Sequence, residues 1–222
     1  MAIAVVQTAV AGSTGGTTVT TGAVDTTGAN LIVISVSSYN SAVAPTDSKG
    51  NTWTPLTDRL NGAYHERLYY CASPTVGSGH TFTAAGAASY PTICVLAFSG
   101  AHATPFDQES GGGAASGTSS QPGSITPSED NCVLVTGVDF GAGVAASING
   151  SFTASSVDYD TSDHMGGGIA YKIQTTAGAE NPTWSWTISG VNATAMASFK
   201  AAASSYIDNT SPIMRCILWA AD

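Results

Sequence analysis

The chain has 222 residues, of which 9% are charged and 43% are hydrophobic, and its formal net charge is −9. This hydrophobic content argues against a disordered chain, which needs low hydrophobicity and high net charge. Six Lys and Arg residues in all argue against binding to nucleic acid or to an anionic membrane surface, because both need clustered positive charge.

Short segments rich in β-branched and aromatic residues alternate with Gly, Asn, Ser and Pro, as in strands joined by turns. Helical periodicity is almost absent. The predicted strands are Ala2–Val10, Leu31–Tyr39, Thr52–Leu56, Arg67–Ala72, His80–Thr83, Pro91–Phe98, Val133–Phe140, Ser151–Asp158, Gly168–Thr175, Thr183–Ser189 and Thr194–Ala201. This pattern predicts an all-β fold, an antiparallel β-sandwich of jelly-roll or related type.

Two parts of the chain resemble each other at a nearly constant spacing. Tyr70 and Tyr171 lie 101 positions apart in similar segments, and so do Phe98 and Phe199. The apolar segment that begins at Leu31 resembles a later one at an offset of 102. The chain therefore contains an internal duplication, which is typical of folds built from repeated units.

The repeated halves span about 31–101 and 132–202. Each half has only about 70 residues and no obvious staple, so we expect them to pack face to face as a single β-sandwich over residues 1–203. The Gly/Ser-rich stretch 110–124 has the composition of a flexible surface crossover.

Residues 204–222 fall outside the repeat and form a C-terminal tail. They are expected to add a final strand to their own sheet, or to form an assembly arm that docks on a neighbouring subunit. The apolar and aromatic residues of this arm are Tyr206, Ile207, Ile213, Met214, Ile217, Leu218 and Trp219.

Features of export and of disulfide or metal frameworks are absent from the sequence. No Lys or Arg precedes the short apolar stretch at the N-terminus, so no signal peptide is predicted. We expect a protein that stays in the producing cell or leaves it inside a virion. Cys71, Cys94 and Cys132 lie in apolar strand-like segments and are expected to be buried thiols, with a disulfide to Cys216 as the alternative.

The sequence contains no recognisable catalytic motif. The four histidines lie outside metalloprotease and hydrolase motifs, and we expect them in loops or at strand edges. A glycosidase needs a carboxylate pair, and no such pair can be assembled from the sequence among Asp47, Asp58, Glu66, Asp107, Glu109, Asp139, Asp158, Asp160 and Asp163. We therefore predict no catalytic residues, no cofactor and no enzymatic activity.

Two acidic segments differ in the chemistry that they predict. Asp47 stands in Thr-Asp-Ser-Lys-Gly-Asn, where an Asp side chain caps a turn. Asp158, Asp160 and Asp163 form the densest acidic loop. A solvated loop is the first expectation, with a bound hard cation such as Ca²⁺ as the alternative.

Trp184 and Trp186 stand two positions apart on one predicted strand and therefore face the same side. The first expectation is that they belong to the sandwich core. The alternative is that they form a glycan platform together with Tyr159, because flat aromatic rings stack on sugars.

The order of several segments resembles a β-sandwich domain family of phage virion proteins and bacterial surface proteins. The resemblance covers residues of about 3–202. The segments that carry it are Leu31-Ile-Val-Ile-Ser, Asp47-Ser-Lys-Gly-Asn-Thr-Trp, Tyr69-Tyr-Cys-Ala, Val95-Leu-Ala-Phe-Ser-Gly-Ala and Pro105-Phe-Asp.

This resemblance implies a non-enzymatic virion structural protein, most simply a capsid decoration protein or a tail surface protein. Its expected partners are other virion proteins, namely major capsid or tail subunits, and further copies of itself in a homo-oligomer. The alternative is a carbohydrate-binding module or adhesin that contacts a host-surface glycan. No nucleic acid or membrane partner is expected.

Overall fold

A computed structural model describes residues 2–13, 15–86, 89–141, 145–159 and 165–203. The described strands are β1 (Ala4–Gly12), β2 (Thr18–Thr20), β3 (Leu31–Tyr39), β4 (Pro45–Asp47), β5 (Thr54–Pro55), β6 (Arg59–Asn61), β7 (Tyr64–Ala72), β8 (Phe82–Ala85), β9 (Ser89–Ser99), β10 (Ala101–Ser120), β11 (Cys132–Phe140), β12 (Ser147–Ile148), β13 (Thr153–Tyr159), β14 (Gly166–Gln174) and β15 (Trp184–Ala201). Within these ranges no helix is long and apolar enough to cross a membrane.

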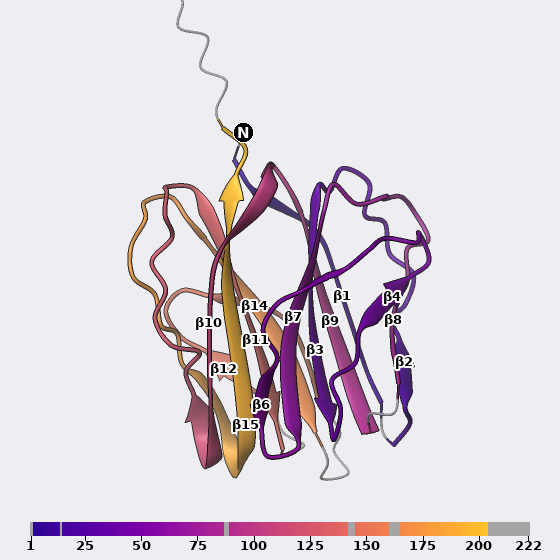
Figure 1. Cartoon of the computed structure of the whole chain (residues 1–222), viewed down its shortest axis with the longest axis vertical. Helices are drawn as coiled ribbons and strands as arrows, with labels where there is room; N and C mark the ends of the chain where they lie inside the picture. The colour runs from indigo at the N-terminus through magenta and orange to yellow at the C-terminus, as the bar shows by residue number, and fades with distance from the viewer. Residues whose placement is uncertain (1, 14, 87–88, 142–144, 160–164, 204–222) are drawn as a thin grey trace, which may run out of the picture.

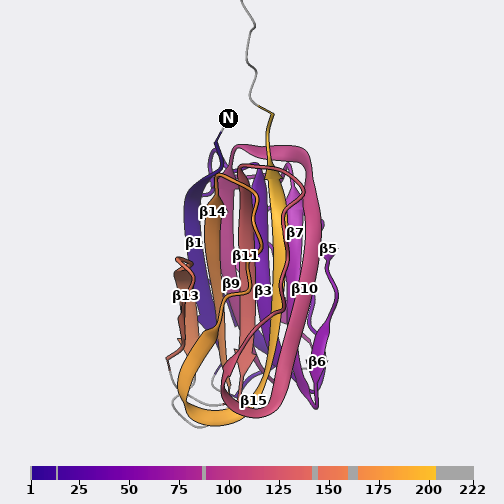
Figure 2. The ribbon, with the colours of Figure 1, turned by 90° about the vertical axis from the view of Figure 1, so that its left-hand side faces the viewer.

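The strands form an antiparallel β-sandwich, which confirms the predicted fold class. The first large sheet has the order β1-β9-β3-β7-β5, with β6 also paired to β7. The second has the order β10-β15-β11-β14-β13, with β12 also paired to β15. A small sheet, β2-β8-β4, lies on the outer side of the first (Figure 1), and the strands of both large sheets run along the long axis of the molecule (Figure 2).

All strands of the first large sheet precede Gly100 and all strands of the second follow it, and the two sheets repeat the same register. Val33 pairs with Tyr70 between β3 and β7, and Val135 pairs with Tyr171 between β11 and β14. The β3–β9 and β11–β15 ladders repeat in the same way. The chain crosses between the sheets at Gly100, where φ is 76° and a Cβ would overlap the carbonyl oxygen of Ala2.

Apolar side chains fill three layers. The inner layer between the large sheets contains Leu31, Phe98, Val133 and Phe199. One outer layer lies under the small sheet, and the other lies against β12 on the second large sheet. The central strands β3 and β11 are therefore covered on both faces, which explains why their sequences are nearly continuous apolar segments.

The Gly/Ser-rich stretch does not form the flexible crossover that its composition predicts. Residues 101–120 are one long strand, β10, which pairs with β15 at the edge of the second sheet. Its glycines permit close backbone packing: a Cβ at Gly112 would overlap the carbonyl oxygen of Gln121, and one at Gly113 would lie 2.5 Å from the carbonyl oxygen of Asn192. The tail over 204–222 lies outside the described residues.

Candidate functional site

The Asp47 carboxylate holds together the turn that the sequence predicted. Its Oδ1 accepts a hydrogen bond from the Lys49 backbone N–H at 2.7 Å. Its Oδ2 accepts one from the Trp53 indole Nε1 at 3.0 Å. The Asp47 side chain is fully buried, so these bonds fix both the turn and the direction of the Trp53 ring.

His80 completes this network from an isolated bridge just before β8, a loop position of the kind expected for the histidines, but its side chain is buried. It is 0% exposed, and its Nε2 lies 3.2 Å from Asp47 Oδ1. Its Nδ1 lies 2.9 Å from Thr26 Oγ1. Burial lowers the pKa of His80, so the neutral ring donates to Asp47 and accepts from Thr26. The three residue types match a hydrolase triad, but all three side chains are buried and therefore have a structural role.

The Trp53 side chain packs against the apolar layer under the small sheet, and the side chains on either side of it face solvent. The Trp53 ring packs edge-on against Phe82, with ring centroids 6.1 Å apart. Because side chains alternate along an extended segment, Thr52 and Thr54 point outward, and both are exposed. Their hydroxyls line one wall of a groove at the edge of the first sheet.

The opposite wall is the start of β10. Between Ala101 and Phe106 the β10–β15 ladder is interrupted by a bulge. Beyond it, Phe106 stacks on Tyr70 with ring centroids 5.9 Å apart and an interplanar angle of 12°. Both rings also contact Phe199 edge-on, so the inner core fixes this half-buried aromatic pair from below.

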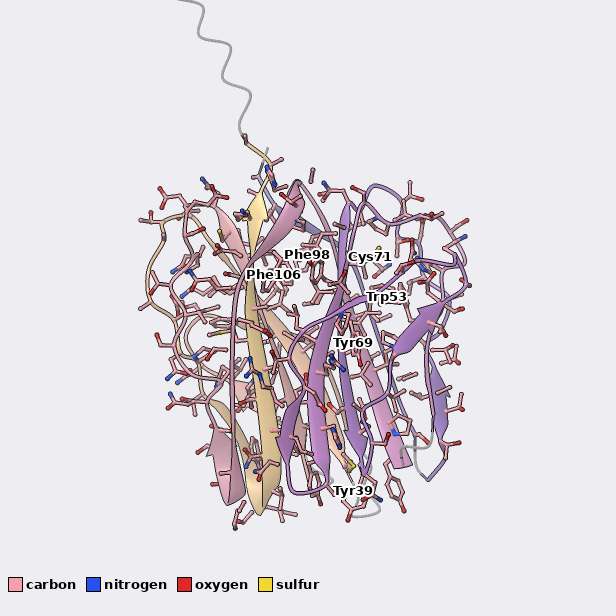
Figure 3. All side chains as sticks on the ribbon, in the orientation of Figure 1. Tyr39, Trp53, Tyr69, Cys71, Phe98 and Phe106 are labelled. Atoms are coloured by element: carbon pink, nitrogen blue, oxygen red, sulfur yellow. The ribbon has the colours of Figure 1, made fainter. Side chains whose placement is uncertain are left out.

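The groove between these walls has a volume of about 500 Å³. Phe106 and Cys71, both labelled in Figure 3, line it. Its lining residues are Thr52, Thr54, Tyr70, Cys71, Ala72, Ala103, Thr104, Pro105 and Phe106. None of them is Asp, Glu, Lys, Arg or His, so the groove offers ring faces and hydroxyls to a neutral ligand.

A second, more polar hollow of about 340 Å³ lies where β6 approaches β10, lined by Asp58–Asn61 and Gly111–Gly113. Arg59 forms an ion pair with Glu109 at 3.5 Å. Asn61 donates to the carbonyl oxygen of Asn192 at 2.9 Å. The charged groups beside this hollow are thus bound to the protein itself.

Two of the three residues of the predicted glycan platform are buried. Trp184 is 0% exposed and Trp186 is 5% exposed, and both pack in the outer layer of the second sheet. Phe140 stacks on the Trp186 ring at 5.3 Å. Neither ring can therefore stack on a sugar at the surface, whereas the core interpretation of these residues is confirmed. The Tyr159 side chain lies outside the described part.

Other predicted site residues also lie outside what the structure describes. This holds for the Asp158 side chain, for Asp160 and Asp163 of the acidic loop, and for all seven residues of the assembly arm. Among the described residues no group of three or more His, Cys, Asp or Glu side chains is placed to hold a metal ion.

The cysteines of the strands are buried, as predicted. Cys71, Cys94 and Cys132 are at most 7% exposed. Burial raises the pKa of the Cys71 thiol and raises that of Cys132 to about 11, so neither is a reactive thiolate. Cys216 is outside the described residues.

Sequence reasoning missed one carboxylate pair. Glu66 and Asp139 were among nine candidates, and the sandwich brings them together, but both are 0% exposed. No substrate can reach them in this state.

No protein-family model matches the chain, and no curated protein matches it.

Proposed function

We propose that this chain is a non-enzymatic structural protein of a phage particle that acts through contacts with other virion subunits and with copies of itself. The observation that carries this proposal is β10, an edge strand of 20 residues. No described strand pairs with its outer edge. A strand edge of this length is a template for pairing with a strand of another chain.

The charges of β10 do not protect this edge. Asp107 accepts a hydrogen bond from Ser198 Oγ at 2.9 Å. Glu109 accepts from the Thr57 hydroxyl at 2.7 Å and pairs with Arg59. The strand from Gly111 onward carries no charged side chain, so it lacks the lysines and inward charges with which edges usually prevent association.

The rest of the surface is also suited to neutral contacts. Four of the five Lys and Arg residues in the described part are bound to acceptors of the same chain. What remains outside is rich in Thr, Ser, Ala and Gly. Such a surface supports association through buried area rather than through charge recognition, and about 1,600 Å² of buried area is enough for a stable interface.

The first test is to label intact phage particles with gold-tagged antibody against this chain. Label on the head or the tail is expected, and label confined to cells or medium would overturn the proposal. The second test is Ala115→Lys, on the exposed part of β10. We expect lost incorporation into particles with unchanged thermal stability, whereas Thr187→Lys on neighbouring β15 is the matched control and should be incorporated normally.

The groove favours a second candidate function, binding of a neutral host-surface glycan. The supporting observation is the Tyr70–Phe106 stack flanked by threonine hydroxyls with no charged lining residue. Aromatic faces and hydroxyls are the groups that hold sugar rings. A glycan array tests this: Phe106→Ala should abolish binding, and Ile173→Ala, at an exposed apolar residue outside the groove lining, should not. Binding that survives Phe106→Ala, or no binding at all, would exclude this role.

A further inference from the structure

The layer between the two large sheets changes character along its length. It is aromatic at the Phe98 and Phe106 end, and polar toward the end marked by Tyr39 (Figure 3). At the polar end Glu66 extends from β7 in the first half of the chain, and Asp139 extends from β11 in the second half. One carboxyl group from each repeat therefore lies in the same buried layer.

Glu66 is well supported by hydrogen bonds, and Asp139 is not. Ser35 Oγ donates to Glu66 Oε1 at 2.7 Å, and Ser37 Oγ donates to Oε2 at 2.8 Å. Neither carboxyl oxygen of Asp139 forms a hydrogen bond within normal geometry among the described residues. The backbone N–H of His65 favours its ionised form, but less strongly than burial opposes it.

Glycines on the second sheet make room for these polar groups. A Cβ at Gly137 would overlap Glu66 Oε1 and would lie 2.6 Å from Ser35 Oγ. A Cβ at Gly167 would lie 2.6 Å from Ser37 Oγ. The Glu66 carboxyl thus occupies space that a side chain at Gly137 of the opposite sheet would fill.

No positive charge faces this pair in the part of the chain described. On Glu66's own strand, the Arg67 side chain points to the opposite face, where its Nε donates to the Leu56 carbonyl oxygen. The ionisable groups that act on the pair from neighbouring positions are Asp58, which disfavours a charge on Glu66, and Tyr64, whose own pKa is raised by burial and then by Asp139.

Neutral groups of the described residues on three other elements also border this layer. They are Ser35 and Ser37 on β3, Thr92 on β9 and Gly167 on β14. Burial raises the pKa of Glu66 to about 8 and raises that of Asp139 well above its usual value, and the neighbouring Glu66 carboxyl raises the pKa of Asp139 further. Two unpaired charges in such a layer are unfavourable because each loses its hydration.

We propose that Glu66 and Asp139 form a proton-binding site between the two halves of the chain, and that their protonation at neutral and acidic pH keeps the sheets together. Raising the pH ionises first one carboxyl and then the other within the closed layer. The resulting repulsion, between one charge from each repeat, loosens the sandwich. This inference does not depend on the proposed virion role.

The test is equilibrium urea unfolding between pH 5 and 9 for the wild type, Glu66→Gln, Asp139→Asn and the double variant. A carboxyl that is protonated in the folded state and ionised in the unfolded state costs stability as pH rises between the two pKa values. The unfolding constant of the wild type should rise about tenfold per pH unit for each such carboxyl. That rise should shrink in each single variant and vanish in the double variant. Glu129→Gln, at an exposed position, should behave as the wild type.

Two further measurements keep the inference falsifiable if a variant fails to fold. Infrared spectra of the wild type at pH 7 should contain the carbonyl stretch of a buried protonated carboxyl, which should disappear reversibly above pH 9. The same urea titrations are repeated with EDTA and with Ca²⁺. Ca²⁺ that stabilises the wild type but not Glu66→Gln would identify a cation site and overturn the proposal. A missing protonated-carboxyl band, or equal pH dependence in wild type and double variant, would also overturn it.

Discussion

Removal of the Asp47 carboxylate by Asp47→Ala should be among the most damaging single substitutions in the small sheet and the turn that follows β4. The carboxylate is fully buried and accepts hydrogen bonds from the Lys49 N–H, the Trp53 indole, His80 and the Asn51 side chain. Hydrogen bonds to a charged group contribute about 1.5–3 kcal/mol each when well formed, and donors left unpaired in the interior add a desolvation cost.

The bonds from Lys49 and Trp53 are the two shortest, at 2.7 and 3.0 Å, and they reach different carboxylate oxygens. We therefore count only these two fully. The expected loss in the free energy of unfolding is then about 3–6 kcal/mol. The assay is urea unfolding at pH 7 followed by tryptophan fluorescence, which also reports the release of the Trp53 ring. Asp25→Ala is the matched control, because exposed Asp25 caps a neighbouring turn through Thr27, and it should change stability far less. A loss below about 1 kcal/mol for Asp47→Ala would refute the role of this network.

Two other substitutions test the packing of the second sheet, each with its own control. Gly137→Ala places a methyl group on the buried carboxyl of β7 and should lower the free energy of unfolding by about 1–3 kcal/mol through overpacking. Gly22→Ala, where the added methyl group meets nothing within 4 Å, should be near neutral. Equal urea midpoints for the two variants would contradict this expectation. Trp184→Phe removes ring volume and an indole donor that bonds a threonine hydroxyl on β11 at 3.2 Å. Trp186→Phe removes the same ring volume, but its indole N–H has no partner among the described residues. The melting temperature should therefore fall further in Trp184→Phe than in Trp186→Phe.

The strands that could be predicted best are those buried on both faces. Leu31–Tyr39 has the same bounds in the sequence prediction and in the structure, because a continuous apolar segment between turn residues has few other uses in a β protein. The aromatic spacing of 101 residues predicted the duplication, and its register is repeated in both sheets. The edge strand β10 was missed because Gly and Ser residues suggest flexibility when their close backbone neighbours are unknown.

The polar interior was out of reach of sequence reasoning for a different reason. Glu66 and Asp139 come from different halves, so their proximity depends on how the two sheets are stacked. The buried network of His80 could not be predicted because its partners Thr26 and Asp47 lie 54 and 33 positions away in the sequence. Local patterns predict which residues form strands, but they contain no information about which side chains meet across layers.

The division of the sheets between the two halves has a consequence for the newly made chain. All strands of the first large sheet precede Gly100, so this sheet can pair fully before the second half exists. At synthesis rates of about 5–20 residues per second, its inner face waits several seconds for its cover. Until the second sheet is made, the Glu66 carboxyl is exposed to water and ionised at the pH of the cell. Closure of the sandwich should therefore be accompanied by uptake of a proton.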